Sequence, residues 1–136
     1  MAKIRKVDYF VMHSANRAGE GAKLLKALKK LDVSLLAMTA FPDGTGAQVD
    51  LVPDDTQKFM RAVKTLGWEV SARKIGFMVQ GKNRTGALTG LLAKLGKAKI
   101  NVTAIDAVTV GKKRYGAIFW VKPADVASAA KLLGAR

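Results

Sequence analysis

Apolar residues change their spacing several times along the chain, and each change predicts a new element. The runs VDYFVMHS (7–14) and VSLLAMTAF (33–41) are apolar and rich in β-formers, so both stretches favour strands. The segment AQVDLV (47–52) alternates polar and apolar residues, which is typical of a half-buried strand. Between the first two strands, leucines recur at the spacing of a helical face: Leu24, Leu25, Leu28 and Leu31.

A second helix and a fourth strand complete the first half of the chain. Residues with N-cap chemistry precede this helix: Pro53, Asp54, Asp55 and Thr56. Its apolar face carries Phe59, Met60, Val63 and Leu66. Gly67 ends the helix, and WEVSAR (68–73) follows as the fourth predicted strand. The order βαββαβ is that of a ferredoxin-like sandwich, a four-stranded antiparallel sheet under two helices.

The same order is repeated in the second half of the chain. At an offset of 67 positions Asn16 falls on Asn83, and further along the offset grows to 70, because the second copy has three more residues in VGKKRYG (110–116). Length changes belong in turns, so this shift supports a true repeat. We therefore predict an α+β protein of two ferredoxin-like βαββαβ sandwiches in tandem, residues 6–72 and 73–136.

The second copy stops at KLLGAR (131–136), so we expect its last strand to be missing. In this topology the fourth strand lies against the first, and the strand IGFMVQ (75–80) would then expose an apolar edge. The amino-terminal segment, a strand of the first copy or a second chain could cover that edge. We expect a homodimer whose ligand sites lie at domain interfaces.

Each copy passes from its first strand to its first helix through the pattern Asn-Arg-x-Gly. Gly19 and Gly86 permit backbone angles that other residues resist. The first amides of the following helix lack internal partners and, with the helix dipole, favour a carboxylate. The side chain of Asn16 or Asn83 can accept a hydrogen bond from an ammonium group. The pattern suits an α-amino acid, although Asn is also a common helix cap and Gly is common in tight turns.

The stretch KNRTGALTGLLAKLGKAKINVTAIDAV (82–108) resembles the corresponding part of ACT domains, small regulatory modules of amino-acid metabolism. The resemblance covers nearly the whole chain, as a tandem pair. In the serine-binding ACT domains of phosphoglycerate dehydrogenase, Asn residues before the first helix and at the start of the second strand hold the ligand. The resemblance implies these roles for Asn83 and Asn101. In the first copy Ser34 occupies the Asn101 position, so that copy matches less well.

The candidate ligand-binding residues follow from the pattern and the resemblance together. In the second copy they are Asn83, Thr85, Gly86, Ala87, Leu88 and Asn101. In the first copy they are Asn16, Gly19 and Ser34. The one histidine, His13, lies three residues before Asn16, one further than in the dehydrogenase pattern, and no role is transferred to it.

Composition excludes most catalytic chemistry. The 136 residues include no cysteine and one histidine, and most of the 10 acids fall in turns, caps and helix surfaces. No carboxylate pair, Ser-His pair or metal-ligand spacing can be assembled, so we expect no enzyme, no metal and no cofactor. The absence of cysteine and of a long apolar run indicates a cytoplasmic protein without a membrane span.

The charge keeps a second hypothesis open. With 24 Lys and Arg the formal net charge is +14, which raises the odds of a polyanion partner, and the RNA recognition motif shares the βαββαβ topology. However, KRYGAIFWV (113–121) has Arg114 where that motif needs glycine and Ala117 where it needs a second aromatic ring. We therefore rank a basic RNA- or polyanion-binding module second to an amino-acid-binding regulatory or sensor protein that acts on a partner enzyme.

Overall fold

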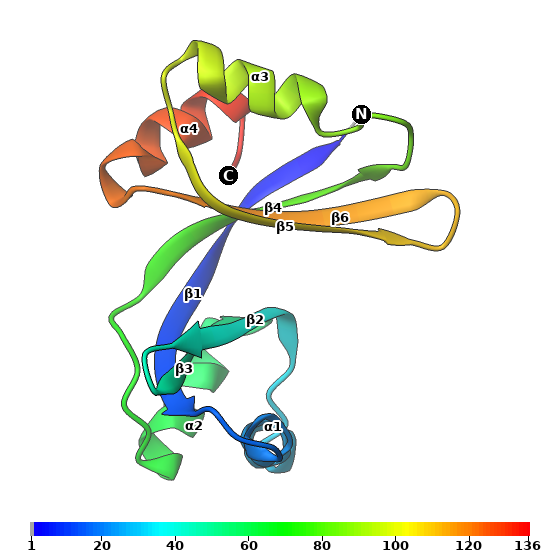
Figure 1. The fold of residues 1–136 in the computed structure, drawn as a ribbon. Coiled ribbons are helices and arrows are strands. Elements are labelled where there is room, and N and C mark those ends of the chain that lie inside the picture. Colours follow the sequence, from blue (N-terminus) through cyan, green and yellow to red (C-terminus); the bar gives the residue numbers. More distant parts are fainter. Residues whose placement is uncertain (1) are drawn as a thin grey trace. The chain divides into compact units, whose positions relative to one another are not determined.

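The computed structural model describes residues 2–136. Their elements, in chain order, are β1 (Lys3–Ala15), α1 (Glu20–Lys30), β2 (Leu35–Asp43), β3 (Gly46–Pro53), α2 (Thr56–Leu66), β4 (Lys74–Lys82), α3 (Thr89–Lys97), β5 (Val102–Val110), β6 (Arg114–Val121), a 3₁₀ turn (Pro123–Asp125) and α4 (Val126–Leu133) (Figure 1). The strand order is β2-β3-β1-β4-β6-β5. This is the predicted α+β class. None of the described helices is long and apolar enough to cross a membrane.

The chain divides into two compact units that do not follow the halves of the sequence exactly. The first unit is residues 8–74, and the second is residues 75–136 together with the described residues up to Val7. The division therefore passes through β1, whose two ends belong to different units. Each unit has its own core of buried side chains.

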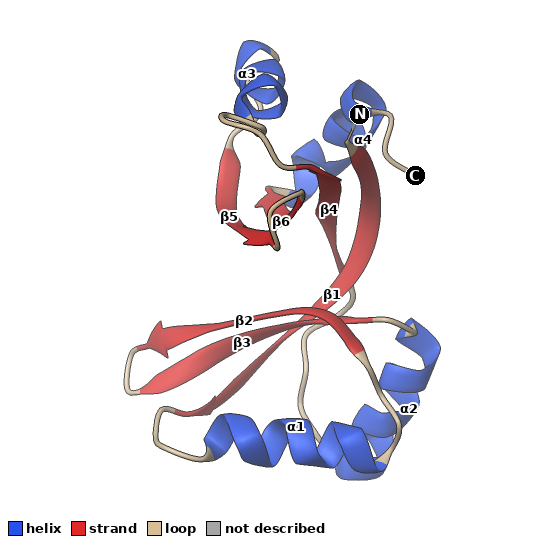
Figure 2. Cartoon of the chain, turned by 90° about the vertical axis from the view of Figure 1, so that its right-hand side faces the viewer, coloured by secondary structure: helices blue, strands red, loops and turns tan. Residues whose placement is uncertain are grey.

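In the first unit β1 and β2 pair antiparallel with β3, and α1 and α2 cover one face of these strands (Figure 2). The alternation predicted for 47–52 places Val49 and Leu51 in the core below the helices. The rings of Phe10 and Phe59 lie 4.9 Å apart there, so β1 packs directly against α2. The core also contains Leu24 and Leu28 of α1, as their spacing predicted, whereas Leu25 of α1 and Met60 of α2, predicted on the same apolar faces, are exposed.

The segment 68–73 is not a strand, and the prediction of a fourth strand there was wrong. It does contact β1, because the Ser71 amide donates to the Val11 carbonyl at 2.9 Å. The Val11 amide, in return, donates to the Ser71 hydroxyl at 2.9 Å. A side chain thus takes the place of a ladder carbonyl, which interrupts regular strand pairing.

The amino-terminal segment supplies the strand that the second copy lacks. No strand follows α4 in the described residues, and β1 is the hydrogen-bonded neighbour of β4. The part of β1 in this unit ends at Val7, and Ile4 packs against the core of the unit. The Lys6 amide also donates to the Arg136 carbonyl at 3.1 Å. Of the three candidate covers for the edge at residues 75–80, the amino-terminal segment is therefore the one present (Figure 2).

The first helix of each unit ends in the same turn. Asp32 and Lys99, 67 positions apart, both have left-handed backbones, with φ of 57° and 61°. The next amide, of Val33 or Ile100, donates to the carbonyl five residues back at 3.0 or 2.9 Å. Left-handed angles are uncommon for residues other than glycine. Their occurrence at matched positions shows that the repeated sequence produces repeated local geometry.

Candidate functional site

The turn before α3 is the centre of the candidate site. After β4 ends, the Ala87 amide donates to the Arg84 carbonyl at 3.1 Å, and the Thr89 amide donates to the Gly86 carbonyl at 2.9 Å. Gly86 has a φ of 69°, and a Cβ placed there would lie 3.0 Å from the Thr89 hydroxyl. The turn therefore needs glycine at this position, both for its backbone angle and for space.

A hollow of about 370 Å³ lies against this turn. Its lining comes from the turn, from α3, from β5 and from the start of β6: Asn83, Arg84, Gly86, Ala87, Leu88, Thr89, Leu92, Ala107, Val108, Thr109 and Tyr115. Four of the predicted residues are in this set, namely Asn83, Gly86, Ala87 and Leu88. Thr85 is part of the turn without lining the hollow.

Hydrogen-bond donors at the turn are left unused. Among the described residues none accepts from the amides of Thr85, Gly86 and Leu88. Arg84 lines the hollow, and its guanidinium forms no ion pair within the described chain. Amides at a helix start and a guanidinium both bind carboxylates, so the arrangement can hold an acid group.

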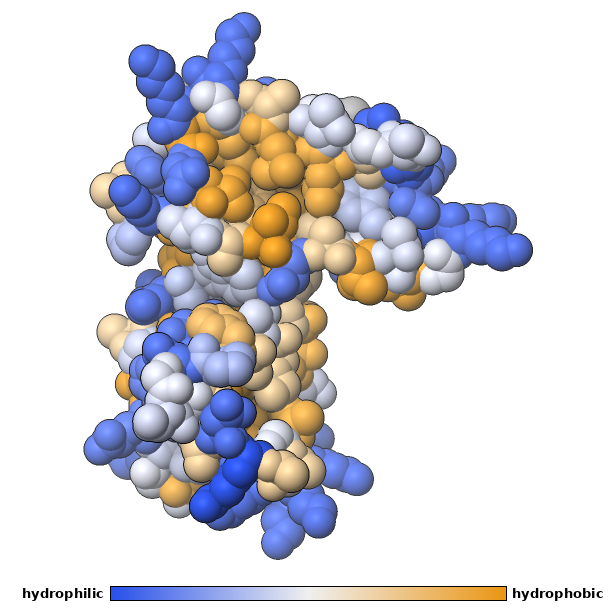
Figure 3. Space-filling model, viewed as in Figure 1, coloured by the Kyte–Doolittle hydropathy of each residue, from blue (hydrophilic) through white to orange (hydrophobic). Residues whose placement is uncertain are grey.

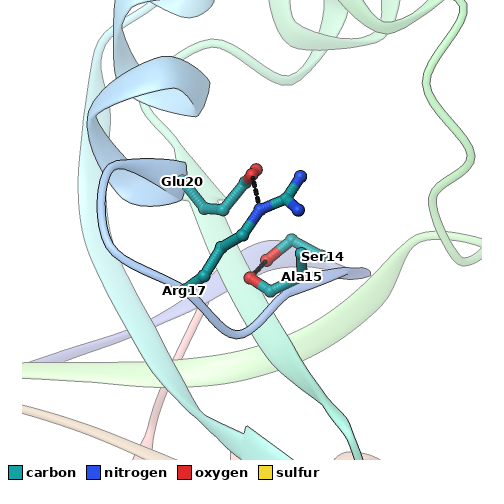
Figure 4. A network of polar contacts seen from close by, with 4 residues as sticks. All are labelled: Ser14, Ala15, Arg17 and Glu20. Carbon is teal, nitrogen blue, oxygen red and sulfur yellow. Dashed lines mark hydrogen bonds and ion pairs between the residues drawn. The ribbon is translucent and has the colours of Figure 1, made fainter.

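The matching turn before α1 is closed by an ion pair. The Arg17 Nε donates to Glu20 Oε1 at 2.8 Å, as Figure 4 shows. This hydrogen bond, together with the positive charge, lowers the pKa of Glu20 below its usual range. The hollow here is only about 130 Å³, and Asn16, Arg17 and Glu20 line it. Gly19 caps the helix with a φ of 89° and does not line this hollow.

A larger hollow of about 440 Å³ lies beside the end of β1 in the first unit. His13, Glu20, Lys23 and Trp68 are among its lining residues. The exposed His13 Nδ1 lies 3.9 Å from a carboxylate oxygen of Asp43. Glu20, which pairs with Arg17, adds a carboxylate to the lining of this hollow. The chemistry of this hollow therefore differs from that of the hollow at the α3 turn, which is lined by hydrogen-bond donors.

Asn101 lies far from Asn83 within the second unit. Asn101 precedes Val102, which pairs with Val121, whereas Asn83 follows Lys82, which pairs with Arg114. These two positions are seven residues apart on β6, which corresponds to about 23 Å along a strand. A single amino acid therefore cannot contact both Asn83 and Asn101 of one unit.

The first unit has the same separation. Ser34 precedes Leu35, which pairs with Pro53, while Asn16 follows Ala15, which pairs with Gly46. Ser34 instead lines a separate hollow of about 250 Å³ at the end of α1. The residues predicted to form one site in each copy thus lie at opposite ends of the strands of their unit.

Sequence reasoning missed seven of the lining residues: Arg84, Thr89, Leu92, Ala107, Val108, Thr109 and Tyr115. One signal was present for Arg84: the repeat aligns it with Arg17 but replaces Glu20 by Ala87, which removes its partner. Nothing local pointed to Thr109 or Tyr115, because they reach the hollow through strand pairing. The described residues contain no group of three or more His, Cys, Asp or Glu that could hold a metal ion.

No protein-family model matches the sequence, and no curated protein matches it either. Solved structures do match the fold. A protein of Bacteroides thetaiotaomicron is 16% identical with a TM-score of 0.79, over 98% of this chain and 88% of that one. Regulatory subunits of aspartate kinase from Thermus thermophilus, in a ligand-free form, and from Thermus flavus have TM-scores of 0.65 and 0.64. They are 12% and 17% identical, and in both cases 98% of this chain and 94% of the other are covered. At these identities the likeness is one of fold alone.

Proposed function

We propose that this chain is a non-catalytic regulatory protein, built from two ACT-like domains, that binds an amino acid at the turn before α3. The observation that carries the proposal is the set of unused donors that line the hollow, namely the amides of Gly86 and Leu88 together with Arg84. These donors suit the α-carboxylate, and the Asn83 side-chain oxygen suits the α-ammonium group. The side chain of the ligand then extends along Leu92 and Val108.

The size of the hollow agrees with this ligand class. At about 370 Å³ it lies at the small end of the range for small-molecule sites. Its walls combine a few polar groups with apolar side chains of α3 and β5, the usual composition of such a site. The regulatory subunits with the same fold belong to aspartate kinase, and we propose by analogy that this chain also acts on a partner enzyme.

A second copy of the chain would bring Asn101 into the site. β5 is the outer strand of its sheet and exposes Ile105, Val108 and Val110, so it offers an apolar edge for pairing. If two β5 strands pair antiparallel, the start of one lies beside the end of the other. Asn101 of the second copy then lies next to the hollow at Asn83. This homodimer keeps both residues in one site despite their separation within a unit.

A thermal-shift screen of the twenty amino acids tests ligand class. A ligand at about 100 times its dissociation constant adds roughly 2.7 kcal/mol of stability. For the ligand found, Asn83→Ala should weaken binding about 10- to 100-fold, the scale of a hydrogen bond to a charged group. Asn16→Ala is the matched control and should leave affinity unchanged. Unchanged affinity in Asn83→Ala would remove the site from this turn.

Light scattering tests the dimer. We expect twice the 14.5 kDa chain mass for the protein, and the chain mass for Ile105→Lys, because a lysine on an edge strand opposes pairing and Ile105 does not line the hollow. The monomeric variant should also bind the ligand more weakly, as Asn101→Ala should in the dimer. A monomeric protein with full affinity would show that the site is complete in one chain.

A further inference from the structure

Five cations of the second unit lie on the segments that meet beside the turn before α3. They come from the end of β4, the turn before α3 and the hairpin between β5 and β6: Lys82, Arg84, Lys112, Lys113 and Arg114. All five are exposed, and Figure 3 shows hydrophilic side chains projecting from this hairpin. The Asn83 amide donates to the Lys113 carbonyl at 2.8 Å, which fixes the hairpin beside the turn. We call these five residues the basic cluster.

The basic cluster has no acidic partner. None of its members forms an ion pair with a described residue. Asp106, the acid on the same hairpin, lies opposite Ile118, four positions along β6 from Arg114. That separation corresponds to about 13 Å along a strand. Lys82 and Arg114 are moreover direct cross-strand neighbours, and like charges in such pairs repel. An anion bound at this end would relieve the repulsion.

The first unit shows that the fold does not require this cluster. Its corresponding hairpin, between β2 and β3, carries Asp43 and Gly44 instead of three cations. Its matching arginine, Arg17, is neutralised by Glu20, whereas the second unit has Ala87 at that position. Two units with the same backbone plan therefore differ in the charge around the same turn. The fold therefore does not require the excess of positive charge at the second turn.

From this difference we infer that the ligand of the α3 turn is an amino acid with a second acidic group, either a carboxylate or a phosphate. The inference rests on the proposed function and narrows it. The α-carboxylate is held by the turn and Arg84, and the second acid is held by Lys112, Lys113 and Arg114 of the basic cluster. Charge-assisted hydrogen bonds of this kind are roughly twice as strong as neutral ones.

Calorimetry with matched ligand pairs tests the inference. The pairs are aspartate and asparagine, glutamate and glutamine, and O-phosphoserine and serine, each titrated at 50 and 150 mM salt. We expect the acidic member of at least one pair to bind about 10-fold or more tightly than its neutral partner. This difference in affinity, called the gap below, should become smaller at higher salt. A gap in the first two pairs identifies a carboxylate, and a gap in the third identifies a phosphate.

Two double variants with equal loss of charge separate local from general electrostatics. Lys112→Gln with Lys113→Gln should remove most of the difference in affinity within each pair, mainly by weakening binding of the acidic member. Lys94→Gln with Lys97→Gln, in the last turn of α3, should preserve the gap. A gap reduced equally by both double variants would show that net charge alone is responsible and would overturn the inference.

The remaining outcomes are also decisive. Equal affinity within every pair would overturn the inference while leaving amino-acid binding at the turn in place. Binding of none of the six ligands, with the other amino acids also silent in the thermal-shift screen, would overturn the proposed function as well. Tight binding of an RNA oligonucleotide at 150 mM salt, lost in the Lys112 and Lys113 double variant, would assign the basic cluster to nucleic acid instead.

Discussion

Before α1, the Arg17 guanidinium lies 2.8 Å from the Glu20 carboxylate; before α3, the matching Arg84 has Ala87 at the equivalent position and four more cations around it. Both turns follow a strand, both carry Asn-Arg-x-Gly, and both place the glycine in the left-handed region. The two turns thus share their backbone conformation but differ in the charges of their side chains. The comparison separates what the fold needs at this turn, a glycine, from what the proposed ligand would need, an unpaired cation and free amides.

The two units also differ in how the strand position beside their first long strand is filled. In the first unit an irregular segment approaches β1 through Ser71, and in the second unit β4 is covered by the start of β1. A single strand of 13 residues therefore serves both units. The unit that carries the candidate site depends for its edge on residues at the opposite end of the sequence.

The largest effect we expect comes from breaking that dependence. Ile4→Asp places a carboxylate against the core of the second unit and should lower the free energy of unfolding by about 2 to 4 kcal/mol. Lys3→Asp, at an exposed neighbouring position, is the control. Denaturant unfolding gives the loss, and hydrogen exchange at residues 75–80 locates it. Continued protection of these amides in Ile4→Asp would show that the segment does not hold the edge.

Installing the ion pair of the first turn in the second should close the site. Ala87→Glu sets a carboxylate three residues after Arg84, the spacing of Arg17 and Glu20, and should weaken ligand binding about 10- to 100-fold. Calorimetry measures the change, and Ala87→Gln, which adds similar bulk without charge, is the control. An equal loss in both variants would indicate a steric effect rather than competition for Arg84.

The reverse exchange should open the first turn only partly. Glu20→Gln releases Arg17, and we expect a second, weaker binding event in calorimetry, because this turn lacks the hairpin cations. The affinity of the α3 turn should stay within about twofold, since sites without shared partners behave nearly independently. A single binding event with unchanged stoichiometry would mean that Arg17 alone is not enough to create a site.

The smallest effect concerns the pH dependence of the closed turn. Because Arg17 lowers the pKa of Glu20, the pair stabilises the fold above the ordinary carboxyl pKa of about 4.3. That contribution is lost as the pH falls through the lowered value. Arg17→Ala should raise the pKa of Glu20 towards its ordinary range in a carbon-detected NMR titration. An unchanged pKa in this variant would show that the ion pair is not formed in solution.

The sequence by itself determined the local structure and the frame of the site. Except for the strand predicted at 68–73, periodicity gave the order of strands and helices, and the repeat identified the turns around Asn16 and Asn83. These features depend on neighbours within one or two helical turns, so they are written in short stretches of sequence.

Tertiary structure alone decided the rest. The strand that pairs with β4 comes from residues about 70 positions earlier in the chain. The apolar pattern of those residues does not indicate with which unit they will pair. The same holds for Asn101, whose distance from Asn83 follows from strand register across β6 rather than from its place in a motif. Arg17 is paired and Arg84 is not, because only Arg17 contacts a glutamate side chain. The basic cluster forms only when the end of β4 lies beside the β5–β6 hairpin. Hydrogen bonds and charge contacts between residues distant in the chain produce no periodic pattern in the sequence, so they are seen only in the folded structure.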